Sequence, residues 1–118
     1  MCARTCLVLG ILGNQITALA AKGTMDGQAL NQASRWVTTK EQHADLVIST
    51  VAQYFLTQRV KDVAPGAEGY DEYLASLARH HLVLRKAMAT KQSADPATAD
   101  TLKAAIQDFA KDYDHHHH

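Results

Sequence analysis

Apolar residues recur at intervals of three and four positions along three long stretches of this chain, and this spacing constrains the fold more than any other feature. The stretches cover residues 25–63, 69–91 and 96–113. Such spacing places side chains on one face of an α-helix, whereas the side chains of a strand alternate at every second residue. Residues 46–54 are rich in Val, Ile and Thr, which favour strands, but they do not alternate. We therefore expect helices throughout.

Turn residues divide the three stretches. Pro65-Gly66 with Gly69 marks one connection, and Asp95-Pro96 marks the next, with Asp95 expected to cap the helix that follows. Residues 38–41 (Thr-Thr-Lys-Glu) match a capping box, so the first long helix is expected either to break near residue 38 or to continue through it. Since 118 residues suit one domain and short connections favour antiparallel neighbours, the sequence predicts an all-α, antiparallel bundle of three to four helices.

Residues 1–23 fit two interpretations. They resemble a secretory leader, because Arg4 precedes an apolar run at residues 7–13 and the small-residue pattern Ala18-Leu19-Ala20 follows it. They also carry an apolar stripe of helical period, which would make them a first helix. Cleavage would place the protein in the periplasm or outside the cell, and retention would place it in the cytoplasm. In either case we expect no transmembrane span, because the run is short, and the bundle domain covers residues 24–114.

Cysteines and a histidine run occupy the two ends of the chain. Cys2 and Cys6 are four positions apart, so they would share one face of a helix. A metal held by two thiolates needs further ligands, which nothing nearby supplies, so we interpret both cysteines as small apolar residues. Residues 115–118 are consecutive histidines. Most such runs are the remnant of a purification tag, and a native metal-binding tail is the alternative.

The charge of the chain argues against two classes of partner. The 12 basic and 12 acidic residues balance, and the basic residues are spread thinly along the sequence. A protein that binds nucleic acid concentrates positive charge against the phosphates, and so does a polybasic membrane anchor. We therefore expect neither of these partners.

Histidines in the middle of the chain are the candidate metal ligands. His81 falls on the apolar face of its helix, and His80 is turned about 100° from it. Adjacent residues on a helix do not face one ion, so a site would need His43 or a carboxylate from the facing helix. The Glu-x-x-His motif of di-iron bundles does not occur. The alternative is a core histidine that bonds a backbone carbonyl or a tyrosine hydroxyl.

Aromatic residues are the candidate partner contacts, namely Trp36, Phe109 and Tyr113, although packing within the chain would explain them as well. No nucleophile elbow and no phosphate-binding glycine loop occur. The sequence therefore predicts a non-catalytic interaction protein without a cofactor: an adaptor, assembly factor, small chaperone or inhibitor/immunity protein. It would act on a protein partner or as a homo-oligomer. The alternative is a bundle that binds a transition metal or a small ligand through His80 and His81.

Overall fold

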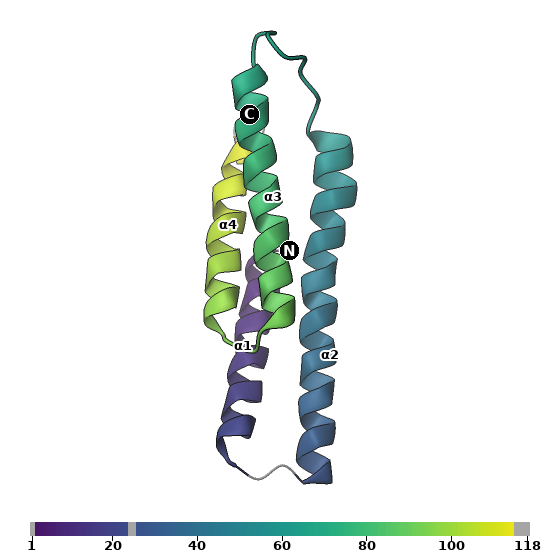
Figure 1. Ribbon diagram of the computed structural model, residues 1–118, viewed down its shortest axis with the longest axis vertical. Helices are drawn as coiled ribbons and strands as arrows, with labels where there is room; N and C mark the ends of the chain where they lie inside the picture. The colour runs from purple at the N-terminus through teal and green to yellow at the C-terminus, as the bar shows by residue number, and fades with distance from the viewer. Residues whose placement is uncertain (1, 24–25, 115–118) are drawn as a thin grey trace.

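The computed structural model describes residues 2–23 and 26–114, and the side chains of residues 4–23 and 26–113. Its elements are four α-helices and one π-helical segment: α1 (Cys2–Ala21), α2 (Gly27–Ser49), η1 (Thr50–Arg59), α3 (Tyr70–Gln92) and α4 (Ala97–Asp114). In Figure 1, α2 and η1 form one long rod beside the other helices. Helix α1 contacts α2 and α4, and α3 contacts the same two helices. The predicted all-α bundle is confirmed.

Side chains and glycines set the ends of the helices. Asp26 caps α2 by accepting a hydrogen bond from the backbone N–H of Ala29 at 2.8 Å. Asp95 does the same for the start of α4, where the N–H of Ala97 donates to its carboxylate at 3.0 Å. The turn before α3 needs positive φ at Gly66 and Gly69, at 82° and 89°. The predicted turns therefore fall where the bundle reverses direction.

Of the two alternatives that the sequence left open near residue 38, the structure has the continuous helix, because α2 runs unbroken through this position. The hydroxyl of Thr39 donates to the carbonyl of Arg35 at 3.0 Å, so this threonine satisfies its hydroxyl inside the helix and does not cap a new one. The irregularity lies farther along, in η1. There the N–H of Val60 donates to the carbonyl of Phe55 at 2.8 Å, the five-residue spacing of a π-helix.

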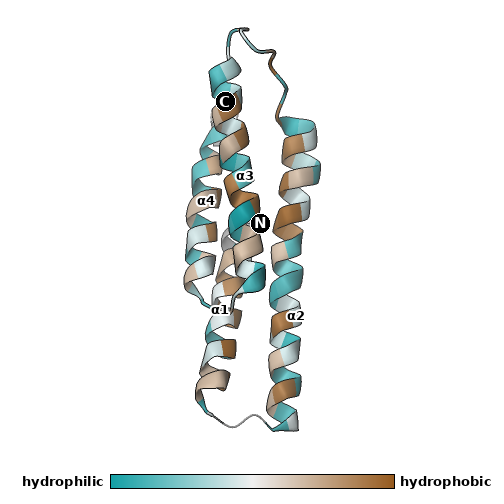
Figure 2. Ribbon diagram, viewed as in Figure 1, coloured by the Kyte–Doolittle hydropathy of each residue, from teal (hydrophilic) through white to brown (hydrophobic). Residues whose placement is uncertain are grey.

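All four α-helices contribute to one core. Figure 2 shows apolar and polar residues interleaved along each helix, as expected of amphipathic helices that pack together. Helix α4 buries one complete face. The buried apolar cluster consists of Cys6, Leu9, Val47, Val51, Val83, Ala87, Ala99, Leu102, Ala105, Ile106 and Phe109.

Helix α1 packs closely against the rest of the bundle. Leu9 is 1% exposed, and a Cβ added at Gly13 would lie 2.8 Å from the carbonyl oxygen of Ala94. The window Arg4–Ala21 has a mean hydropathy of 1.3 and is long and apolar enough to cross a membrane. This window is longer than the apolar run at residues 7–13, on which the expectation of no span rests. A core helix or a leader passes the same test, so this property does not establish a membrane span.

Candidate functional site

A buried histidine and a tyrosine form a hydrogen-bonded pair between α3 and α4. His80 is fully buried. Its Nδ1 lies 2.7 Å from the backbone carbonyl oxygen of Ser76, and its Nε2 lies 2.5 Å from the hydroxyl of Tyr113. Since a carbonyl oxygen only accepts, Nδ1 carries the proton, and in the neutral ring Nε2 accepts from the tyrosine. The alternative to a metal ligand is a core histidine that bonds a backbone carbonyl or a tyrosine hydroxyl. His80 makes both of these contacts.

Aromatic rings enclose this pair. The His80 ring lies 5.0 Å from Phe109 and 5.7 Å from Tyr113, both edge to face, and 6.3 Å from Phe55. The π-helical η1 supplies Phe55, and α4 supplies the other two rings. Burial raises the pKa of Tyr113, and the nearby Asp112 carboxylate adds to the rise. The phenol therefore keeps its proton at neutral pH and donates to His80.

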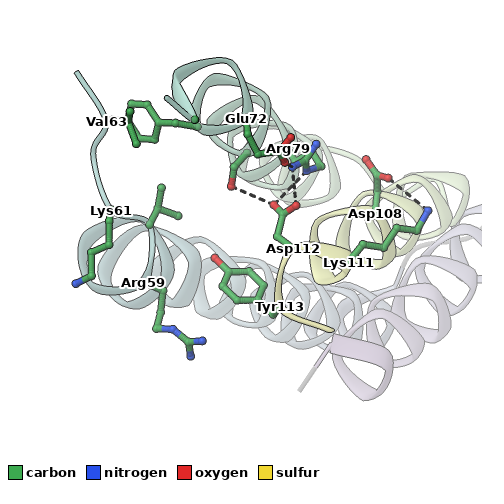
Figure 3. A pocket seen from close by; sticks show the side chains of 13 residues that line it. Arg59, Lys61, Val63, Glu72, Arg79, Asp108, Lys111, Asp112 and Tyr113 are labelled. Carbon is green, nitrogen blue, oxygen red and sulfur yellow. Dashed lines mark hydrogen bonds and ion pairs between the residues drawn. The ribbon is translucent and has the colours of Figure 1, made fainter. Parts of the chain in front are cut away.

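Tyr113 also lines a cavity of about 570 Å³ between the end of η1, the start of α3 and the end of α4. On one side Arg79 pairs with Asp112 at 2.6 Å and with Glu72 at 3.0 Å. The hydroxyl of Ser76 donates to the same Asp112 at 3.1 Å. In Figure 3 Asp112 lies between Arg79 and Tyr113, the residue that follows it on α4. Two of the three carboxylates that line the cavity, Glu72 and Asp112, are thus paired with Arg79.

The opposite rim of the cavity is cationic. Arg59 donates to the hydroxyl of Tyr54 at 3.0 Å, and its guanidinium lies 5.2 Å from the centre of the Tyr113 ring. Lys61 donates to the carbonyl of Gln58 at 2.9 Å. Among the described side chains of residues 4–23 and 26–113, neither cation forms an ion pair with a carboxylate. In Figure 3 both turn their charged ends away from the Arg79–Asp112 pair.

The three histidines predicted as metal ligands do not form one site. His80 uses both ring nitrogens within the core. His81 is exposed on α3, and His43 is partly buried on α2. In the described part of the chain, no group of three or more His, Cys, Asp or Glu residues could hold a metal ion. The histidine run at residues 115–118 lies outside the described residues.

The predicted partner contacts pack mainly inside the chain. Phe109 is 3% exposed and belongs to the core. Tyr113 is partly buried and packs against that core, and Trp36 is partly buried on α2. Packing within the chain therefore accounts for the stripe of α4 that the sequence offered as a docking face.

The cysteines lie at the start of α1. Cys6 is 4% exposed and lines a hollow of about 210 Å³ together with Ala99 and Lys103 of α4. Cys2 is the first residue of the helix, four positions earlier. The helical period brings these two positions to one face of α1. The sequence contains no other thiol.

Comparison with known proteins gives one family. The model of a family described as nickel-containing superoxide dismutase matches residues 7–117. No curated protein and no solved structure matches the chain. The match overturns three predictions: a non-catalytic interaction protein, the absence of enzymatic activity, and the absence of a cofactor. The match supports the alternative of a metal-binding bundle better than it supports a non-catalytic interaction protein.

The signal that sequence reasoning missed lies in the match over residues 7–117. No short catalytic motif marks the matched residues, so reasoning from motifs could not find the enzyme family. The matched span begins directly after Cys6, and the interpretation of both cysteines as small apolar residues gives their thiols no role. Their thiols are the one pair of strong metal donors that the histidine argument did not consider.

Proposed function

Because the chain belongs to the nickel-containing superoxide dismutase family, we propose that it binds nickel and converts superoxide into O₂ and hydrogen peroxide. The family match over residues 7–117, nearly the entire chain, carries this proposal. A bound nickel ion would supply one-electron chemistry, taking an electron from one superoxide and returning it to another. The protein must then hold the metal, keep its ligands reduced and admit a small anion.

The chemistry of the donors favours Cys2 and Cys6 as the residues that hold nickel. Thiolates bind first-row transition metals strongly, and Ni(II) accepts nitrogen donors in tetragonal sites. The two thiols belong to one short segment, and the backbone nitrogens at the start of α1 are the nearest nitrogen donors along the chain. His43, His80 and His81 do not offer a comparable set. The donor types present therefore fit nickel at the start of α1.

The bundle has a clear role in such a site. Helix α1 is fixed by burial of Leu9 and by the close approach of Gly13 to Ala94, so Cys6 is held against α4. A buried cysteine is shielded from solvent oxidants, which would otherwise convert the thiolate into sulfinic acid. The proposal thus assigns α1 a functional role and requires that residues 2–21 remain in the active protein.

Nickel titration and superoxide decay test the proposal together. The protein should be truncated after Asp114, because the following histidines bind nickel on their own. Cys2→Ser and Cys6→Ser should each abolish nickel-dependent activity, whereas His81→Ala, an exposed histidine on α3, should leave it unchanged. Nickel-dependent activity that survives in both serine variants would exclude the thiols as ligands.

Self-association belongs to the same proposal. Leu7 and Ile11 are 65% and 48% exposed, and they are one helical turn apart on α1 beside Cys6. An exposed apolar pair of this kind favours contact with a second copy. Sedimentation of the wild type and of Leu7→Gln/Ile11→Gln checks it: an assembly that dissociates in the double variant supports a homo-oligomer, and a monomeric wild type contradicts it.

A further inference from the structure

The hydrogen bond between His80 and Tyr113 has the chemistry of a proton-coupled redox pair. Oxidation of a phenol by one electron makes its proton strongly acidic, so the reaction is fastest when a base already holds that proton. Here Nε2 of His80 lies 2.5 Å from the phenolic oxygen and is the acceptor in the neutral ring. We infer that Tyr113 is a redox-active tyrosine whose proton acceptor is His80.

The proton stays within this pair, whereas the electron leaves it. Tyr113 gives one electron to an outer-sphere metal-complex oxidant, such as the ruthenium(III) complex of the test below, which is reduced to ruthenium(II), and its O–H bond breaks as the proton moves to Nε2 of His80. The products are a neutral phenoxyl radical and an imidazolium. That imidazolium donates two hydrogen bonds, one from Nδ1 to the carbonyl of Ser76 and one from Nε2 back to the phenoxyl oxygen. Both hydrogen bonds of the His80 ring are kept in the products, so the buried imidazolium has hydrogen-bond acceptors as soon as it forms.

The surroundings keep the proton on the pair. The rings of Phe55 and Phe109 pack against His80 and offer no group to accept a proton. His80 is fully buried, so the imidazolium cannot exchange readily with bulk water. The proton therefore stays within reach of the phenoxyl oxygen and returns when the radical is reduced.

The other tyrosines lack this arrangement. The hydroxyl of Tyr54 accepts a hydrogen bond from Arg59, and Tyr70 and Tyr73 pack against each other with ring centres 6.3 Å apart. Among the described residues, only Tyr113 has a hydroxyl bonded to a histidine. Tyr73 lines the same cavity as Tyr113 and is therefore the matched control.

Superoxide can reset the radical from the cavity. The cavity wall carries four cationic side chains and three carboxylates, and Arg59 lies 5.2 Å from the Tyr113 ring. This balance favours a small anion near the ring. Superoxide would give its electron to the phenoxyl and leave as O₂, while the proton on Nε2 returns to the phenolic oxygen. This reset rests on the proposed function, because that function supplies the superoxide. Formation of the radical does not depend on the proposed function.

Laser-flash oxidation of the full chain by photogenerated tris(bipyridine)ruthenium(III) tests the inference, with the tyrosyl radical followed by transient absorption and electron paramagnetic resonance. We expect a radical in the wild type and in Tyr73→Phe, and its loss in Tyr113→Phe. His80→Gln keeps a hydrogen-bond acceptor but not a base, so oxidation of Tyr113 should slow by about a hundredfold, the low end for a positioned base. Circular dichroism verifies that each variant is folded.

Three outcomes would overturn the inference. They are an equal radical yield in Tyr113→Phe, an unchanged rate in folded His80→Gln, or loss of the radical in Tyr73→Phe. If His80→Gln does not fold, the wild-type rate in D₂O decides, because proton transfer to His80 requires a slower reaction there. The assay needs no nickel, so failure of the nickel proposal leaves its result unaffected. Added superoxide should shorten the radical lifetime, and an unchanged lifetime would exclude the reset step.

Discussion

The ammonium of Lys40 lies 2.5 Å from the backbone carbonyl oxygen of Ser93 and ties the middle of α2 to the turn between α3 and α4. Lys40 is 4% exposed, and burial lowers its pKa while Glu41 opposes the change. Lys40→Ala should therefore destabilise the protein by about 1–3 kcal/mol, since the Ser93 carbonyl loses its donor. Urea unfolding measures the loss, and exposed Lys103→Ala is the control. An equal effect of the two substitutions would contradict this role.

Lys40 also gives stability a defined dependence on pH. Its pKa is lower in the folded protein than the ordinary 10.5, so between those two values the unfolded chain binds more protons. Stability should therefore rise as the pH increases from the lowered pKa toward 10.5. The measurement is the difference in unfolding free energy between the wild type and Lys40→Met over this interval. A difference that stays constant with pH would show that the ammonium is not perturbed by folding.

The close approach of α1 to the turn before α4 predicts opposite effects at two glycines. A Cβ at Gly13 would lie 2.8 Å from the carbonyl oxygen of Ala94 and 3.3 Å from Pro96, so the backbone must move. Gly13→Ala should cost about 1–3 kcal/mol, as overpacking does. Gly10→Ala meets nothing nearer than the Cβ of Ala99 at 3.9 Å, and should stabilise the helix by about 0.5–1 kcal/mol. Thermal unfolding checks both, and equal stability of the two variants would contradict this packing of α1.

Removing the Tyr113 hydroxyl should reduce stability as well. Tyr113→Phe leaves Nε2 of buried His80 without its donor, at a cost of about 1–3 kcal/mol. Tyr73→Phe, at a partly buried tyrosine of the same cavity, should change stability far less. Chemical unfolding of both variants measures the difference. Equal losses would show that the hydrogen bond to His80 contributes little.

The helices were predictable because their amphipathic period is strong, but the inward face of α3 was not. The sequence placed His81 in the core and His80 to one side, whereas His80 is buried with Val83, Ala87 and Thr90. Larger apolar residues drew the predicted face away from these small ones, and one residue of that predicted face, Leu74, is 44% exposed. The small residues allow α3 to pack closely, a preference that hydrophobicity alone does not reveal.

The candidate site was less accessible to sequence reasoning than the fold. The pairing of His80 with Tyr113 joins residues 33 positions apart, and no local pattern encodes it. Cys2 and Cys6 were visible as a pair on one helical face, but the further ligands expected of a metal site were sought among side chains alone. Every residue carries a backbone nitrogen, so a metal ligand of this kind cannot be recognised from the residue types of a sequence.

We propose that this chain is a nickel enzyme whose thiols at the start of α1 hold the metal. The most direct measurement is superoxide decay catalysed by the protein truncated after Asp114 and loaded with equimolar nickel, with its intact mass recorded on the same sample. We predict rapid decay that requires nickel, is lost in Cys6→Ser, and belongs to a protein that retains residues 2–21. Nickel-independent decay, or a folded protein that lacks those residues and is still active, would exclude a nickel site at the start of α1.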